Sequence, residues 1–141
     1  MTVSSEERSR NGDSLPAAIS TAIVRLLGEY TGRGPTKART TIRDNVVVVM
    51  LEQTLTKGER SLAERGMGEK VIDIRHAFQE SMRVESSDRI AELTGRRVTA
   101  MLSANHLDPD IAAEIYVLDA PPDRAAQSWQ VAAEVKAELR K

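Results

Sequence analysis

Residues 32–51 read GRGPTKARTTIRDNVVVVML, and the interpretation of the whole chain begins from this stretch. It opens with glycine and proline, which favour turns. Four basic residues follow with no acidic residue between them: Arg33, Lys37, Arg39 and Arg43. The stretch ends in an apolar run at residues 46–51, where four consecutive valines favour a strand because branching at Cβ restricts their χ1 angle in a helix. The sequence therefore predicts a basic loop leading into a central strand buried on both faces.

Two helices are predicted from apolar residues that recur every three or four positions. The first covers residues 14–30 and ends at Gly32; its narrow apolar seam fits either the protein's own sheet, which we favour, or a partner helix. The second covers residues 69–94 and ends at Gly95, with a weak point at residues 84–87 where the chain could bend; we favour one continuous helix. Their apolar positions are Leu15, Ile19, Ile23, Leu26, Leu27 and Tyr30, then Val71, Ile74, Phe78, Met82, Ile90 and Leu93.

Shorter patterns complete the predicted fold. Thr56 and Glu59 form a capping-box pattern that predicts a short helix ending at Arg65. Residues 98–107 and 111–118 alternate between two sides around the turn-forming sequence Asp-Pro-Asp, which predicts a β-hairpin. The element order α-β-α-α-β-β predicts an α+β fold, in which a small three-stranded, mainly antiparallel sheet carries its helices on one face. Because such a sheet leaves two edges uncovered, we expect a homodimer.

The two ends of the chain differ from the middle. Residues 1–13 are polar and mixed in charge, so we expect a disordered tail before a single domain at residues 14–119. Residues 120–141 begin with a linker containing Pro121 and Pro122, and Trp129, Val131, Val135 and Leu139 then predict a C-terminal amphipathic helix. Trp129 could dock on the domain's own core or on a partner.

Composition narrows the function classes. The chain has 141 residues, a formal net charge of −1 and no cysteine. The absence of cysteine excludes a disulfide framework and a thiolate zinc site, and it favours a cytoplasmic protein. The first residues lack the apolar core of a signal peptide, and the longest apolar run is far shorter than the ~20 residues of a transmembrane helix.

Three sequence features occur in the order typical of one known family. They are the basic Gly-Pro stretch, the pattern L-T-x-x-E at Leu55, Thr56 and Glu59, and T-G-R-x-V from Thr94 to Val98 before the hairpin. In these features the chain resembles the MpsC-like family over about residues 15–119. The resemblance implies a soluble component of a sodium-translocating, membrane-potential-generating system that is also linked to bicarbonate supply. It also implies partners at the cytoplasmic face of a membrane transport system, or in its large soluble subunit.

The candidate functional residues are the basic ones. Arg33, Lys37, Arg39 and Arg43, together with Gly32 and Gly34, whose backbone can approach an anion closely, form a hypothetical anion-binding or partner-binding site. We predict no metal and no cofactor. His106, Asp108 and Asp110 are more typical of a turn than of a metal site. His76 is more typical of a helix surface than of a catalytic base.

No catalytic motif stands out in the sequence: it has neither G-x-S-x-G nor H-E-x-x-H. The sequence therefore favours a non-enzymatic, dimeric interaction module. The alternative is a regulatory protein that binds a nucleotide or nucleic acid through the basic stretch, although nucleic acid is the less favoured partner. Binding to phosphates would weaken steeply as salt rises.

Overall fold

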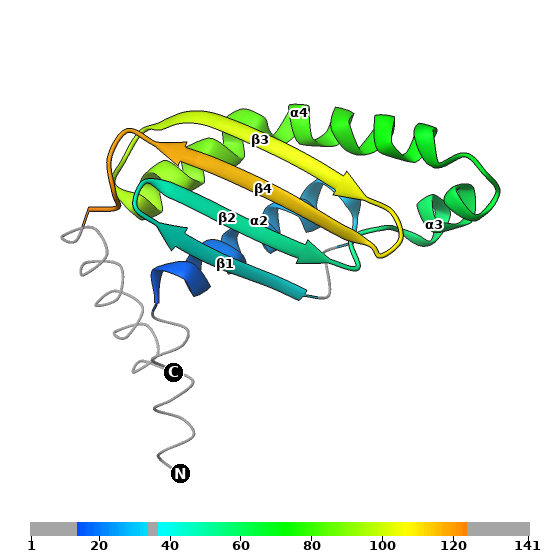
Figure 1. The fold of residues 1–141 in the computed structure, drawn as a ribbon, viewed down its shortest axis with the longest axis horizontal. Helices are drawn as coiled ribbons and strands as arrows, with labels where there is room; N and C mark the ends of the chain where they lie inside the picture. Colours follow the sequence, from blue (N-terminus) through cyan, green and yellow to red (C-terminus); the bar gives the residue numbers. More distant parts are fainter. Residues whose placement is uncertain (1–13, 34–36, 124–141) are drawn as a thin grey trace, which may run out of the picture.

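A four-stranded antiparallel sheet organises the structure. The computed structural model describes residues 14–33 and 37–123. The elements are α2 (Leu15–Thr31), β1 (Lys37–Arg43), β2 (Val46–Glu52), α3 (Lys57–Glu64), α4 (Gly68–Thr94), β3 (Val98–His106) and β4 (Ile111–Leu118). The strands lie side by side in the order β1-β2-β4-β3. Helices α2 and α4 lie behind the sheet in Figure 1, so no described helix covers the face toward the viewer. The predicted disordered tail, Gly34 and the C-terminal helix with Trp129 lie outside the described residues.

The predicted α+β class is confirmed, but the predicted three-stranded sheet is wrong. The additional strand is β1, which covers most of the stretch that the sequence predicted to be a basic loop. Ala38 and Ile42 of β1 pack against the core, and the Thr40 hydroxyl shares a hydrogen bond of 2.7 Å with Ser20 of α2. A two-residue turn at Asp44 and Asn45 joins β1 to β2, and Asp44 has the positive φ of 53° that such hairpin turns use.

Strand β2 is interior, as predicted, because it pairs with β1 on one side and with β4 on the other. The prediction that it is buried on both faces is wrong. Val47, Val49 and Leu51 are buried against the helices, whereas Val46 and Val48 point to the other face and are half-buried. An antiparallel sheet can leave one face without helices, which a continuous apolar run does not reveal.

Helix α2 packs on the protein's own sheet, as favoured. All the predicted apolar positions except Tyr30 are buried, and they join β2 and β4 residues in one hydrophobic core. The Ser14 side chain caps the first turn by accepting a hydrogen bond from the N–H of Ala17, and Gly32 ends the helix with a φ of 75°. That left-handed conformation favours glycine because it has no Cβ.

Helices α3 and α4 also form where predicted. Both hydrogen bonds of the capping box between Thr56 and Glu59 are present at the start of α3. Helix α4 runs without a break through residues 84–87. Its buried face nevertheless differs from the predicted one, because Ile74 is 40% exposed while Arg75 and Gln79 are buried. The helix therefore turns a partly polar face toward the hairpin.

The predicted hairpin of β3 and β4 is confirmed, with an irregular register near Thr99. Its residues divide between the helix side and the side without helices. The side without helices also carries residues of β2. We call the apolar residues that point outward on this side the open face. The open face consists of Val46, Val48, Met50, Ala100, Leu102, Ala104, Ile111, Ala113, Ile115 and Val117.

Candidate functional site

Three of the predicted basic residues lie in a line along one edge of the sheet. Lys37, Arg39 and Arg43 occupy exposed alternate positions of β1, and the register sets Arg39 opposite Met50 and Arg43 opposite Val46. Side chains two residues apart on a strand project to the same face about 7 Å apart. We call these three residues the cationic row. It borders the open face on its β1 side.

Charge in the cationic row is only weakly compensated. Lys37 Nζ lies 4.0 Å from Glu52 Oε2, and the Lys37 side chain is 76% exposed. Within the described part of the chain, neither Arg39 nor Arg43 has an ion pair with an acidic side chain. The row can therefore meet an anionic group without first breaking a strong internal contact.

The other predicted basic-site residues have structural contacts. Arg33 Nη1 donates a short hydrogen bond to the backbone carbonyl of Leu55, which ties the end of α2 to the segment before α3. Gly32 caps α2 through its backbone N–H, which bonds to Gly28 O at 2.9 Å. Arg33 is therefore engaged elsewhere, and the structure brings together three of the four predicted cations.

A second site, missed in the sequence, lies between α4 and the hairpin. Glu114 of β4 points toward α4 and is only 3% exposed. Its carboxyl group accepts hydrogen bonds from Gln79 Nε2 at 3.1 Å and, at a shorter distance, from Ser103 Oγ. Gln79 and Asn105 exchange two further amide hydrogen bonds of 3.0 Å each. Four polar side chains from three elements thus form one connected cluster, which we call the Glu114 cluster.

Burial dominates the electrostatics of the Glu114 cluster. It raises the pKa of Glu114 to about 7, against the opposing influence of the Ser103 and Gln79 hydrogen bonds and of the Arg75 charge. Two residues along β4 on the same side, Tyr116 is fully buried, and burial likewise raises the pKa of its phenol. Glu114 therefore exchanges its proton close to neutral pH.

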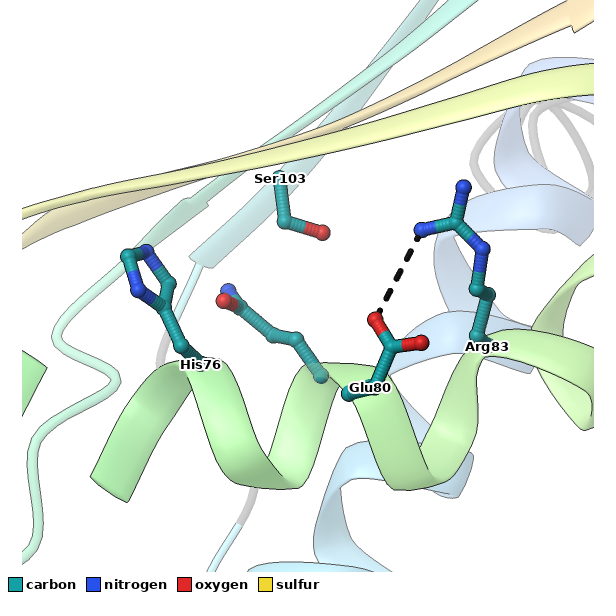
Figure 2. Close-up of a pocket in the computed structure, with 5 residues that line it drawn as sticks. His76, Glu80, Arg83 and Ser103 are labelled. Atoms are coloured by element: carbon teal, nitrogen blue, oxygen red, sulfur yellow. Dashed lines mark ion pairs between the residues drawn. The ribbon is translucent and has the colours of Figure 1, made fainter. Parts of the chain in front are cut away.

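A small cleft opens beside this cluster. It has a volume of about 170 Å³ and is lined by His76, Gln79, Glu80, Arg83 and Ser103. Figure 2 shows Ser103 projecting from β3 toward the helix, with His76 and Arg83 on either side. Two of the lining residues, Gln79 and Ser103, are the hydrogen-bond donors to Glu114. The cleft thus connects solvent with the immediate neighbours of a buried carboxyl group.

The arginines near the cluster have acidic partners of their own. Arg75 Nη1 lies 3.7 Å from Glu59 Oε1 and donates to Thr54 O at 3.3 Å. Arg83 Nη1 lies 3.8 Å from Glu80 Oε2, the ion pair drawn in Figure 2. Each arginine is thus paired with another carboxylate, and Arg75 acts on Glu114 only through a Coulombic attraction that is smaller than the effect of burial.

The predicted turn at residues 108–110 has a structural role. Asp110 accepts hydrogen bonds from Thr54 Oγ1 at 3.0 Å and from the N–H of Leu55 at 2.9 Å, which fastens the hairpin turn to the segment before α3. His106 Nδ1 lies 2.8 Å from Pro109 O. Across residues 14–33 and 37–123, no group of three or more His, Asp or Glu side chains is placed to hold a metal ion.

A model of a known protein family matches the chain. The model of a family described as "Na+-translocating membrane potential-generating system (MpsC)" matches residues 12–120. The chain belongs to the MpsC family. No curated protein and no solved structure matches it. None of the helices in the described part of the chain is long and apolar enough to cross a membrane.

The MpsC match includes both the cationic row and the Glu114 cluster, since all the described strands and helices lie within residues 12–120. Sequence reasoning found the row from its charge but missed the cluster. The hairpin sequence could have indicated part of the cluster, because counting back from the turn sets Ser103 opposite Glu114. Which side of the hairpin α4 covers could not be read from that alternation.

Proposed function

We propose that this chain is a non-enzymatic accessory protein of a sodium-translocating, membrane-potential-generating system and acts through protein contacts on its open face. Membership of the MpsC family supports the role in such a system. Its place would be the cytoplasm, which the lack of cysteine favours. A link to bicarbonate supply is part of the same proposal and rests on the family resemblance.

One observation carries the proposal: the hairpin is more apolar on its outer side than on its inner side. The outer side of β4 consists of Ile111, Ala113, Ile115 and Val117, whereas the inner side includes Glu114. On β3, Leu102 points outward and is 54% exposed, while Ser103 points inward. Contiguous, partly exposed apolar surface of this kind is typical of protein interaction sites.

The proposal includes a homodimer formed across the open face. Two sheets can pack face to face about 10 Å apart, with their apolar side chains interdigitating. Such packing would cover Leu102 and the half-buried valines of β2 in both copies. It would leave the cationic row at the rim, where charged residues are normally found in interfaces.

Light scattering at tens of micromolar tests the dimer, with an expected mass near twice 15.5 kDa. Leu102→Asp should give a monomer, because a carboxylate in a buried interface would lack a partner. Val84→Asp is the matched control: Val84 is 73% exposed on α4, away from the open face, so this variant should remain dimeric. A wild-type monomer throughout the range would rule out the dimer, and a dimeric Leu102→Asp would rule out this face.

A cellular assay tests the role in the system. In cells that lack their own copy of the gene, the wild-type protein and Val84→Asp should restore the sodium-dependent membrane potential, and Leu102→Asp should not. Immunoblots must show that the three proteins are present in equal amounts before the membrane potentials are compared. Full restoration by Leu102→Asp would contradict a role for the open face.

The cationic row supports a second candidate function, the binding of a nucleotide or nucleic acid. Phosphate contacts of three cations would give an affinity for a single-stranded oligonucleotide that falls steeply with salt. Replacing Lys37, Arg39 and Arg43 together by Gln should lower that affinity at least ~tenfold, a loss of about 1.4 kcal/mol. The melting temperature should change little, because exposed charges contribute little to stability. If the wild-type protein does not bind the oligonucleotide at low salt, this candidate is excluded.

A further inference from the structure

Glu114 is a buried acid that forms no ion pair with any described residue. Among the described residues, no Lys, Arg or His nitrogen lies within 4.0 Å of its carboxylate oxygens. Its two hydrogen-bond donors, Gln79 and Ser103, are neutral. A buried carboxylate held only by neutral donors is costly when ionised, and a positive charge beside it would remove much of that cost.

The Glu114 cluster contains several neutral oxygen atoms. Ser103 contributes a hydroxyl oxygen, and the amide oxygens of Gln79 and Asn105 belong to the same hydrogen-bonded cluster. Carboxylate, amide and hydroxyl oxygens are the ligands that hard cations prefer, and they also accept hydrogen bonds from an ammonium group. The cluster contains no sulfur or imidazole group that would favour a softer metal.

The cleft provides the space and the route of entry. Its volume of about 170 Å³ holds a few water molecules, or a small ion with part of its hydration shell. Gln79 and Ser103 line the cleft and also contact Glu114, so a ligand in the cleft would lie next to the cluster.

We propose that the cleft between α4 and β3 binds one compact monovalent cation, either an alkali-metal ion or a primary ammonium group, in exchange for the proton of Glu114. Glu114 supplies the negative charge, and the oxygen of Ser103 is the neighbouring neutral ligand. One positive charge enters as one proton leaves, so the net charge of the site is unchanged.

The remaining charged groups near the site leave this exchange possible. From α4, Arg75 and Arg83 each have a carboxylate partner within 3.8 Å. Ser103 and Asn105 on β3 are uncharged. On β4 the neighbouring titratable group is Tyr116, which stays protonated because burial raises its pKa. His76 lines the cleft and is exposed to solvent.

Competition with protons gives the proposal a quantitative form. With the pKa of Glu114 at about 7, the apparent affinity for the cation should be about tenfold weaker at pH 6 than at pH 8. Conversely, a cation present at ten times its dissociation constant should lower the apparent pKa of Glu114 by about one unit.

The test follows the Glu114 carboxyl carbon by ¹³C NMR while pH is varied in different chloride salts. Sodium, potassium, ammonium and methylammonium chloride are compared with tetramethylammonium chloride at equal ionic strength. Tetramethylammonium has no N–H group and cannot approach a carboxylate closely, so it reports the effect of salt alone. A pKa lowered by the alkali salts identifies a metal ion, and one lowered by the ammonium salts identifies an ammonium group.

Two variants serve as controls. Glu92→Gln removes an exposed acid of α4 that pairs with Arg89 and does not line the cleft, so the cation-dependent shift of Glu114 should persist. Ser103→Ala removes the neutral ligand and should reduce the shift. Identical Glu114 titrations in all five salts would overturn the proposal, as would a shift that disappears in Glu92→Gln but survives in Ser103→Ala. None of these results depends on the oligomeric state, so they are separate from the test of the open face.

Discussion

Replacing Glu114 by Gln should change how stability depends on pH. Burial raises the pKa of this carboxyl from 4.5 to about 7, a difference of about 2.5 units or roughly 3 kcal/mol. Between these two values the folded protein holds a proton that the unfolded chain releases. The free energy of unfolding therefore falls as pH rises from about 4.5 to about 7, and the contribution of Glu114 is constant outside this window.

The Glu114→Gln variant lacks this contribution at every pH. Its amide cannot accept both donors as the carboxylate does, which should cost about 1 kcal/mol at all pH values. The variant should therefore be about 1 kcal/mol less stable than the wild type near pH 4.5 and up to about 2 kcal/mol more stable at pH 8. The two stability curves should cross between these values.

Urea denaturation from pH 4.5 to 8.5 measures the difference, with tetramethylammonium chloride setting the ionic strength so that no small cation competes. Titration of other groups affects both proteins alike and cancels in the difference between them. Glu92→Gln, which alters an exposed acid of α4 away from the cleft, should follow the wild-type curve. Parallel curves for the wild type and Glu114→Gln would refute the argument, because they would mean that Glu114 titrates normally.

Five further substitutions test the fold and the open face. Val47→Asp should prevent soluble folding because Val47 is fully buried, whereas Val48→Asp on the open face should fold but fail to dimerise, as measured by circular dichroism and light scattering. Thr56→Ala should cost about 1 kcal/mol in urea denaturation through loss of the capping box, and Ser61→Ala, at an exposed site of α3, should cost much less. Gly95→Ala should cost about 1 kcal/mol because the residue that ends α4 has a φ of 68°.

Local patterns predicted the elements that depend on near neighbours in sequence. The capping box, the apolar seam of α2 and the β3–β4 hairpin all form where spacing and turn residues indicated. Strand β1 was not predicted because its charged residues suggested a loop. The alternating inward positions of Ala38, Thr40 and Ile42 were not recognised as a strand pattern. The Asp44–Asn45 turn that joins β1 to β2 was also overlooked.

Tertiary contacts determined what the local patterns could not. The apolar spacing of α4 suggested that Ile74 faces the core, but the helix instead buries Arg75 and Gln79. Those side chains find partners in Glu59 and in the Glu114 cluster, which come from other parts of the chain. A polar residue can be buried when hydrogen-bond or ion-pair partners are available in the folded protein. The periodicity of a single sequence contains no information about such partners.

The polarity of the hairpin links the two proposed sites. A sheet with one face on a core normally turns its more apolar side inward, yet here Ile115 and Leu102 point outward while Glu114 and Ser103 point toward α4. Met101, Tyr116 and Leu118 on the inner side anchor the hairpin in the core, so a register shifted by one residue would expose them. The observed register leaves an apolar outer side, which is understandable if that side is buried by another protein. It also sets a carboxyl group beside a cleft, where it can exchange its proton for a cation. Both proposals thus follow from the way this register divides the hairpin between its two sides, and each can fail without the other.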